Sequence, residues 1–330
     1  MKEFDFIHHY LTNCSVSDDE LINGIGDDAA TLRFQSGFDW HISSDMLVCG
    51  RHFFDDVKAS DLAHKVLAVN LSDMAAMGAT PRYVLLSAAL PKLDKVWLDD
   101  FFNTFFNLAK QFGVKLIGGD TVKGDFVFNV TILGQTPQGQ SLQRNSAQVG
   151  DDIWVSGLLG LAAAGLDFSY SFRQPEKNSH INNLIQKLPQ PIIEQCIDKL
   201  LRPNARVDLG VKLLPYANSA LDISDGLVQD LNHILHSSKV GAEIYLSQIP
   251  TLPELEIFAN YHQWILAGGD DYELVFTANP CNAQKIKQIS KQTNIPVYKI
   301  GKINHTNNLK IIKQDGSLLE LAHQGFDHYG

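Results

Sequence analysis

The sequence has little cysteine and no long apolar run. Its four cysteines, Cys14, Cys49, Cys196 and Cys281, lie far apart without a C-x-x-C pair, which favours reduced thiols over a disulfide framework or a zinc site. The best candidate for a membrane span, 153–166, is short and carries three glycines. The acidic, polar start Met1–Asp5 does not resemble a signal peptide. We therefore expect a cytoplasmic protein with no membrane partner.

Positive charge is also scarce. The chain has 27 Lys and Arg against 37 Asp and Glu, a formal net charge of -10. This balance argues against a nucleic-acid partner, which needs a basic face. Phosphate ligands remain compatible with it if metal ions supply the missing positive charge.

Common catalytic signatures are absent as well. The sequence has no G-x-x-x-x-G-K-[ST] loop, no protein-kinase H-R-D or D-F-G set, and no G-x-S-x-G elbow. The glycine-rich stretch 157–165 has two interpretations, an anion cradle or close packing of a helix on a strand, and we favour packing.

The length of 330 residues predicts two domains, which we place at 1–148 and 149–330. In the first, strands are expected at 40–43, 83–89, 115–117 and 126–133, with helical patterns at 62–74 and 97–112. In the second, strands at 219–223, 243–247, 263–267, 273–277 and 297–303 alternate with helical patterns near 180–200, 206–216, 226–237 and 282–293, whereas 171–183 is expected to be an exposed loop. The aromatic stripe of 97–112 is interpreted as a core face. These patterns predict an α+β or α/β chain: an N-terminal mixed sheet with helices and a C-terminal layered α/β domain.

The chain is rich in one construction, an apolar run that ends in small residues and then aspartate. It occurs at Gly24–Asp28, Ile42–Asp45, Leu71–Asp73, Ile117–Asp120, Asp222–Gly226 and Leu266–Asp271. Mg²⁺ takes oxygen ligands, usually one or two carboxylates with water and substrate phosphates, and glycine lets backbone N–H groups approach phosphate oxygens. Singly, a Ser-Asp before a helix is more often an N-cap and a Gly-Asp more often a turn. Jointly, the six predict an enzyme that handles phosphates through bound divalent metal ions.

In these motifs the sequence resembles the thiamine-monophosphate kinase family, of the superfamily that includes aminoimidazole ribonucleotide synthetase and selenophosphate synthetase. The matching segments cover nearly the whole chain in the family's order: Gly24–Ala30, Ser43–Asp45, Asn70–Ala79, Ile117–Thr121, Asp222–Leu227 and Gly268–Leu274.

The resemblance implies that ATP phosphorylates thiamine monophosphate to thiamine diphosphate. It also implies a homodimer whose N-terminal sheets join into a barrel, with the active site in the cleft between the domains. Magnesium ligands by position are Asp28, Ser43, Ser44, Asp45, Asp73, Asp120, Asp222 and Asp225. ATP contacts are Gly119, Asp120, Arg144 and Ser224, and thiamine monophosphate contacts are His52, Asp270 and His323. We assign catalytic roles to Asp45, Asp120 and Asp225.

Two positions depart from the family pattern. Where similar proteins usually have Gly-Gly-Glu-Asp-Tyr-Glu-Leu, this chain has Asp270, a shorter carboxylate. His323 stands where an aromatic side chain usually lies against the substrate, and Phe326 is a nearby substitute. Both changes bear on substrate contact more than on the reaction.

An acceptor that is already a phosphate needs no strong base, because its second pKa is about 6. We therefore predict direct in-line transfer, with positioning and charge neutralisation as the main contributions to catalysis. A phosphohistidine route through His52 is the rival mechanism, and a surface arginine is the alternative interpretation of Arg144. Two other functions remain open: a purine-biosynthesis synthetase of the same superfamily, and a non-catalytic module that binds magnesium and nucleotide.

Overall fold

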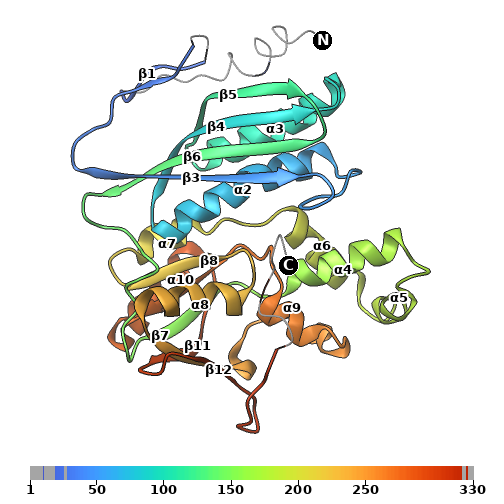
Figure 1. Cartoon of the computed structure of the whole chain (residues 1–330), viewed down its shortest axis with the longest axis vertical. Coiled ribbons are helices and arrows are strands. Elements are labelled where there is room, and N and C mark those ends of the chain that lie inside the picture. The colour runs from blue at the N-terminus through green and yellow to red at the C-terminus, as the bar shows by residue number, and fades with distance from the viewer. Residues whose placement is uncertain (1–9, 11–18, 26–27, 322–324, 326–330) are drawn as a thin grey trace. The chain divides into compact units, whose positions relative to one another are not determined.

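The computed structural model describes residues 10, 19–25, 28–321 and 325. Within them the chain forms two compact units (Figure 1). The N-terminal unit comprises residues 1–74 and 79–141, and the C-terminal unit comprises 75–78 and 142–330.

The N-terminal unit is built on a mixed four-stranded sheet in the order β3-β6-β4-β5. β3 and β4 both pair antiparallel with β6, whereas β4 and β5 are parallel. A two-stranded β1-β2 sheet accompanies it. The bounds are β1 Leu21–Asn23, β2 Thr31–Leu32, β3 Phe38–Val48, α2 Ala59–Met77, β4 Thr80–Leu90, α3 Lys95–Gln111, β5 Lys115–Lys123 and β6 Val127–Pro137.

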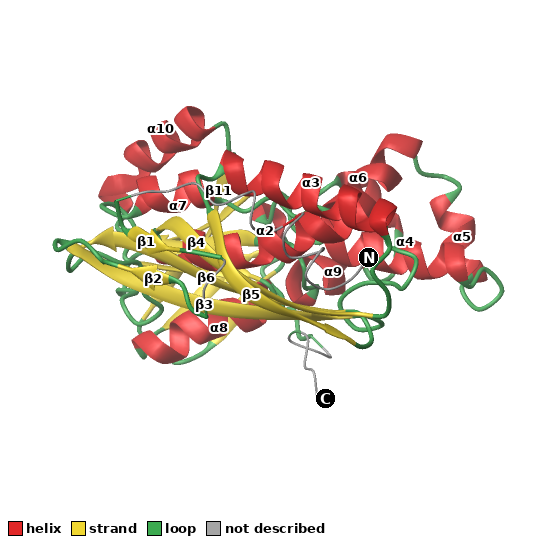
Figure 2. Ribbon diagram, turned by 90° about the horizontal axis from the view of Figure 1, so that it is seen from above, coloured by secondary structure: helices red, strands yellow, loops and turns green. Residues whose placement is uncertain are grey.

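Helices α2 and α3 cover one face of this sheet (Figure 2). α3 begins after the N-cap Asp94, whose carboxylate accepts from the N–H groups of Val96 and Trp97. The predicted aromatic stripe is indeed a core face: Phe101 is 1% exposed, and its ring centroid lies 5.1 Å from that of Phe128 on β6. Burying one such phenylalanine stabilises the fold by about 1.5–3 kcal/mol.

The opposite face of the sheet is only partly covered. At one end, Leu21 and Leu32 of the β1-β2 sheet pack with Tyr83, Ile117 and Leu133. Further along, the large side chains of Ile42, Met46 and Val122 are 67%, 55% and 54% exposed. This face therefore presents apolar surface that the described part of the chain leaves uncovered.

The C-terminal unit contains a six-stranded sheet in the order β12-β9-β11-β7-β10-β8. Neighbouring strands pair antiparallel except β12 and β9, which are parallel. The strands are β7 Asp152–Ser156, β8 Ser219–Ile223, β9 Gly241–Tyr245, β10 Glu273–Ala278, β11 Val297–Asn304 and β12 Leu309–Ile312. The helices are α4 Leu161–Arg173, α5 Ser179–Ile185, α6 Gln190–Leu201, α7 Val207–Leu213, α8 Leu227–Ser238, α9 Tyr261–Ala267 and α10 Ala283–Thr293, with short 3-10 turns η3 Leu246–Gln248, η4 Pro253–Ile257 and η5 Pro280–Asn282.

Helices lie on both faces of this sheet. α8 packs its apolar side on Val155, Leu221 and Ile244, while α7 and α10 lie on the other side (Figures 1 and 2). A second core joins α4, α5, α6 and α9 around Phe168 and Trp264. The predicted class, a mixed N-terminal sheet followed by a layered α/β domain, is confirmed.

Two local predictions are wrong. Residues 263–267 form the end of α9 rather than a strand, because a short buried apolar run has no periodicity that separates the two structures. The segment 171–183 is not simply a loop, since it includes the end of α4 and the start of α5. The helical pattern near 180–200 is two helices, with Pro189 and Pro191 at the start of the second.

Within the described residues, no helix combines the length and apolar character needed to cross a bilayer.

Candidate active site

Three predicted metal ligands of the N-terminal unit meet where β3 packs on α2. The Ser43 hydroxyl donates to the Asp73 carboxylate, with 2.6 Å between Oγ and Oδ2. The backbone N–H of Asp45 donates to Asn70 Oδ1 at 3.1 Å, and Asn70 Nδ2 donates in turn to the Val66 carbonyl. Strand alternation places Ser43 and Asp45 on the helix-covered face, so Asn70 holds the strand where Asp45 projects.

Ser44 and Asp120 lie on the opposite face of the same sheet. The Ser44 hydroxyl contacts Thr131 Oγ1 at 3.0 Å. Asp120 pairs in register with Ser87, which also pairs with Asn129, and its carboxylate accepts the N–H of Thr121 at 2.8 Å. The structure therefore divides the predicted ligands of this unit between the two faces of one sheet.

Asp28 and Gly119 are the other predicted residues of this unit. Asp28 is exposed. Gly119 has a φ of +149°, and a Cβ at this position would lie 1.8 Å from the Leu86 carbonyl oxygen. Strand packing alone thus requires this glycine, and its contact with ATP stays a prediction.

His52 lies in the loop that follows β3. Its Nδ1 accepts the backbone N–H of Val48 at 3.0 Å, and its carbonyl accepts from the buried Lys65 ammonium at 3.2 Å. Because Nδ1 accepts a hydrogen bond, the proton of the neutral ring is on Nε2. The Nδ1 lone pair needed for attack on a phosphorus atom is therefore engaged, which favours a hydrogen-bonding role for His52 over the phosphohistidine route.

In the C-terminal unit, a loop that follows β8 carries Ser224 and Asp225. The buried Asp230 carboxylate accepts from the N–H groups of Ser224, Asp225 and Gly226, each at 3.1 Å. Gln229 Nε2 donates to Asp225 Oδ2 at 3.1 Å. Burial and then the neighbouring Asp225 charge raise the pKa of Asp230 to about 7, against the opposing effect of the three N–H donors. Asp222, also predicted as a ligand, is the next-to-last residue of β8 and is 5% exposed.

A turn that precedes β10 carries Asp270 and lies beside that loop. The N–H groups of Asp270 and Tyr272 donate to the carbonyls of Ser224 and Ile223, both at 2.8 Å. Asp270 and Tyr272 have φ values of 67° and 47°, a region that non-glycine residues seldom adopt. The predicted residues Ser224, Asp225 and Asp270 are thus brought together by direct backbone contacts.

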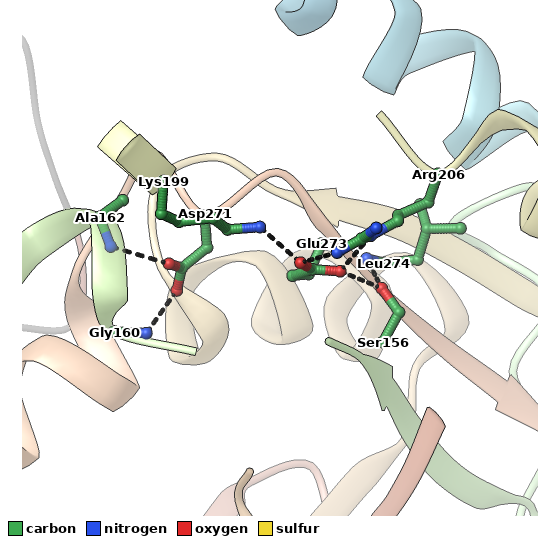
Figure 3. A network of polar contacts seen from close by, with 8 residues as sticks. All are labelled: Ser156, Gly160, Ala162, Lys199, Arg206, Asp271, Glu273 and Leu274. Atoms are coloured by element: carbon green, nitrogen blue, oxygen red, sulfur yellow. Dashed lines mark hydrogen bonds and ion pairs between the residues drawn. The ribbon is translucent and has the colours of Figure 1, made fainter. Parts of the chain in front are cut away.

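The glycine-rich stretch 157–165 binds a carboxyl group that the chain itself supplies. Asp271 Oδ2 accepts the N–H of Gly160 at 2.7 Å, and Oδ1 accepts the N–H of Ala162 at 3.3 Å, at the start of α4 (Figure 3). A Cβ on Gly165 would lie 2.2 Å from the Cys196 carbonyl oxygen. Close packing is thus present at Gly165, but against helix α6 and not against a strand, and the N–H groups of Gly160 and Ala162 hold a carboxyl group of the chain itself.

The buried carboxylate of Glu273 is the centre of a polar network that the sequence did not predict. It accepts from Lys199 Nζ at 2.5 Å, from Arg206 Nε at 2.6 Å and from the Ser156 hydroxyl at 2.6 Å (Figure 3). Burial alone would raise the pKa of Glu273, but Lys199 and Arg206 outweigh it and hold that pKa below its ordinary value. The network fixes the first residue of β10, directly after the Asp270 turn.

The remaining predicted residues are Arg144 and His323. The Arg144 side chain is exposed, and its carbonyl accepts from the Ser238 hydroxyl at 2.9 Å. His323 lies outside the described residues. Gly325 lies against Gln229, the residue that contacts Asp225: a Cβ on this glycine would be 2.6 Å from that of Gln229.

Asp271 leads to a prediction for stability against pH. Burial raises the pKa of this carboxyl to about 7, with Lys199 and two N–H groups opposing part of the effect. Since the ordinary value is 3.8, the folded state binds more protons than the unfolded state between about pH 4 and 7, so the contribution to the unfolding free energy falls as pH rises through that window. Urea unfolding should show the stability of the wild type, relative to Asp271→Asn, falling by about 2–4 kcal/mol between pH 4.5 and 8. A difference that does not change with pH would contradict this.

The oxygen donors in both units fit Mg²⁺ chemically, because carboxylates and hydroxyls are the ligands it prefers. In the described ranges, however, no group of three or more His, Cys, Asp or Glu side chains is arranged to hold a metal ion. Ser43 and Asp73 are two predicted ligands whose side chains are in direct contact.

Similarity to known proteins extends over nearly the whole chain. Residues 26–136 match the model for the AIR synthase related protein N-terminal domain, and 148–314 match the one for its C-terminal domain. The thiamine-monophosphate kinase of Escherichia coli strain K12 is 37% identical over 330 residues, 99% of this chain and 98% of that protein.

Solved structures give the same result. The crystal structure of thiamine-monophosphate kinase from Stenotrophomonas maltophilia K279a has a TM-score of 0.81 and 38% identity, covering 92% of this chain and 93% of that one. The structure of AaThiL complexed with AMPPCP and TMP has a TM-score of 0.73 and 27% identity, covering 92% of this chain and 91% of the other.

Proposed function

This chain belongs to the AIR synthase related family and, within it, to the thiamine-monophosphate kinases, and from that membership we propose that it transfers the γ-phosphoryl group of ATP to thiamine monophosphate. The products are thiamine diphosphate and ADP. The predicted family is thereby confirmed. The main support for the proposal is the similarity to thiamine-monophosphate kinases over nearly the whole chain. The aspartate motifs that predicted the family agree with it.

The chemistry of the chain suits direct in-line transfer. The acceptor phosphate attacks the γ-phosphorus and ADP leaves, so the nucleophile is already largely ionised near neutrality. His52 has its Nδ1 lone pair engaged by the Val48 N–H, which supports a donor role toward the acceptor phosphate through Nε2. We propose that no phosphoenzyme forms.

We assign the magnesium ligands to the carboxylates and hydroxyls predicted from the sequence. They are Asp28, Ser43, Ser44, Asp45, Asp73 and Asp120 in the N-terminal unit and Asp222 and Asp225 in the C-terminal unit. Magnesium, when bound, neutralises the phosphates and stabilises charge on the transferring group. The chain's own contribution is to hold these oxygens in place, as the Asn70 contact with Asp45 and the Asp230 contacts with Ser224 and Asp225 do.

Substrate contacts are assigned in the same way. Gly119, Asp120, Arg144 and Ser224 are proposed to meet ATP. His52, Asp270 and His323 are proposed to meet thiamine monophosphate. The bound AMPPCP and TMP of AaThiL support a site that takes an ATP analogue beside the second substrate. Asp270 offers a negative charge to the positive thiazolium ring.

We further propose a cytoplasmic homodimer, formed through the open face of the N-terminal sheet. The exposed side chains of Ile42 and Met46 on β3 and of Val122 on β5 support this, because large apolar side chains exposed on one face of a sheet are typical of an interface. In the dimer, the two sheets would close into a barrel.

The dimer gives a testable prediction. Ile42→Asp places a charge on the open face and should convert the protein to a monomer in sedimentation-velocity analysis, because burying an unpaired charge opposes association. Val96→Asp is the control, since Val96 is 80% exposed on α3 and lies away from this face. A wild-type monomer, or a dimer that survives Ile42→Asp unchanged, would contradict the proposal.

A panel of acceptors tests the function. The purified chain is incubated with ATP and Mg²⁺ and, separately, with thiamine monophosphate, thiamine or an amide intermediate of purine biosynthesis, and ADP is measured. Of these three acceptors, thiamine monophosphate is the one with which we expect turnover. Turnover with the purine intermediate instead would assign the chain to the synthetases, and nucleotide binding without any turnover would identify a non-catalytic module.

A further inference from the structure

Two buried aspartates of the C-terminal unit belong to neither the ligands nor the substrate contacts assigned above. Asp230 binds the backbone of the loop that carries Asp225, and Asp271 lies in the turn that carries Asp270. Asp230 is 3% exposed, and its Oδ2 accepts three successive N–H groups, from Ser224 to Gly226, each at 3.1 Å. Asp271 is 1% exposed and accepts from Gly160 and Ala162 at 2.7 and 3.3 Å.

Each aspartate holds a segment that would not keep its shape unaided. The 224–226 loop directs three N–H groups to one point, an arrangement that an anion stabilises. The 270–272 turn has positive φ at both Asp270 and Tyr272, which costs of order 1–3 kcal/mol for each residue unless the surroundings enforce it. Asp271 lies between them and ties the turn to the start of α4 (Figure 3).

The two segments are also joined to each other. The N–H of Asp270 donates to the Ser224 carbonyl and that of Tyr272 to the Ile223 carbonyl, both at 2.8 Å. A Cβ on Gly269 would lie 2.5 Å from the Ser224 carbonyl oxygen, so the backbones are in direct contact. Asp230 therefore holds one of two backbone segments that are hydrogen-bonded to each other, and Asp271 holds the other.

We propose that Asp230 and Asp271 are positioning residues, Asp230 for Asp225 and Asp271 for Asp270. Neither contacts substrate or metal in this account; each fixes the backbone from which a working side chain projects. The proposal rests on the proposed function, in which Asp225 holds Mg²⁺ and Asp270 contacts thiamine monophosphate. It predicts that the two anchors affect different substrates of one reaction.

An acidic side chain suits both positions because its oxygens accept hydrogen bonds from the backbone and it carries no N–H group. Asparagine keeps the size but loses the charge and adds an N–H₂ group to a place that already has N–H donors. The substitutions Asp230→Asn and Asp271→Asn therefore loosen each segment without emptying the core.

The matched control is Asp151→Asn. Asp151 is 2% exposed in the same unit and accepts from the Gln148 N–H at 2.9 Å and from Asn218 Nδ2 at 3.0 Å. It is as buried as the two anchors but holds neither segment, so it reports the general effect of neutralising a buried aspartate.

The kinetic experiment measures two constants for each variant. Asp230→Asn should raise the Mg²⁺ concentration for half-maximal rate about tenfold, with the KM for thiamine monophosphate within about twofold of wild type. Asp271→Asn should show the reverse, about a tenfold higher KM with an unchanged Mg²⁺ requirement. Asp151→Asn should change neither constant.

The second readout uses the protein without metal or nucleotide. Amide hydrogen exchange of residues 224–226 should accelerate roughly tenfold in Asp230→Asn, and that of 160–162 should not change. Asp271→Asn should accelerate exchange at 160–162 and leave 224–226 protected. This separation does not depend on activity.

The outcomes are decisive in either direction. The proposal is supported if each variant changes only its own kinetic constant and only its own peptide, 224–226 for Asp230→Asn and 160–162 for Asp271→Asn. It is overturned if each variant changes both constants and both peptides equally, or only lowers the stability. If the asparagine variants do not fold, Asp230→Glu and Asp271→Glu keep the charge, displace the backbone and should give the same separation. A wild-type chain without turnover on thiamine monophosphate would refute the proposed function, whereas active variants with wild-type constants would refute only the positioning roles.

Discussion

Asp45→Asn is expected to abolish measurable turnover, a fall in kcat of at least roughly 10³-fold, while the fold stays intact. The substitution preserves the shape of the side chain but removes the charge that would neutralise a bound Mg²⁺. It leaves the backbone contact of Asp45 with Asn70 untouched, because that contact uses the main-chain N–H.

The experiment compares kcat, circular dichroism and urea unfolding for the variant and the wild type. Asp39→Asn on the same strand is the control, since the Asp39 carboxylate accepts the Gly139 N–H at 2.7 Å and has no proposed role in the reaction. Its activity should stay within about twofold of wild type. Asp45→Asn with retained activity would show that the aspartate constellation has been misinterpreted.

Glu273→Gln is expected to lower the free energy of unfolding by about 3–5 kcal/mol. Glu273 is 1% exposed and accepts from Lys199 and Arg206, which are 9% and 17% exposed. Removing the negative charge leaves the buried Lys199 and the partly buried Arg206 without their counter-ion, and water only incompletely replaces it there.

Urea unfolding monitored by tryptophan fluorescence measures this effect. Lys95→Met is the comparison, because it breaks an exposed ion pair with Asp99 whose side chains are 63% and 39% exposed; pairs of this kind contribute at most about 1 kcal/mol. If Glu273→Gln cost no more than Lys95→Met, the network would have no special part in stability. If this loss is observed, the position of β10 and of the adjoining Asp270 turn depends on two cations, Lys199 of α6 and Arg206, which precedes α7.

The aspartate motifs can be found in the sequence because a local signal marks them. Small residues followed by aspartate after an apolar run are visible within a few residues, and the structure places Ser43 beside Asp73, and Ser224 beside the backbone of Asp270. The aromatic face of α3 was predictable for the same reason, because helical periodicity is local.

The supporting residues were not predictable, because their partners are distant in the chain. Lys199 is 74 residues from Glu273 and Arg206 is 67. A lysine in an amphipathic helix carries no mark that it will be buried. Asp271 could have been suspected from its place in the Gly268–Leu274 motif, but only the fold shows that the N–H groups it binds come from the start of α4.

The sequence also did not show that the predicted ligands of the N-terminal unit lie on two opposite faces of its sheet. Strand alternation puts Ser43 and Ser44 on opposite faces of the sheet, yet the sequence motif lists them side by side. Whether a residue of β3 lies on the helix-covered face depends on where α2 packs. Tertiary contacts such as that between Asp45 and Asn70 determine the packing of α2. The same limit explains the wrong strand at 263–267, where four adjacent apolar residues suit a buried helix as well as a strand.

A single-turnover experiment with γ-labelled ATP tests the central claim most directly. The chain, in excess, is mixed with labelled ATP, Mg²⁺ and thiamine monophosphate, and the label is followed in quenched samples. We predict that it moves from ATP to the terminal phosphate of thiamine diphosphate, with none retained on the protein at any time. Label on a histidine would contradict direct transfer, and the absence of labelled thiamine diphosphate would contradict the proposed function itself.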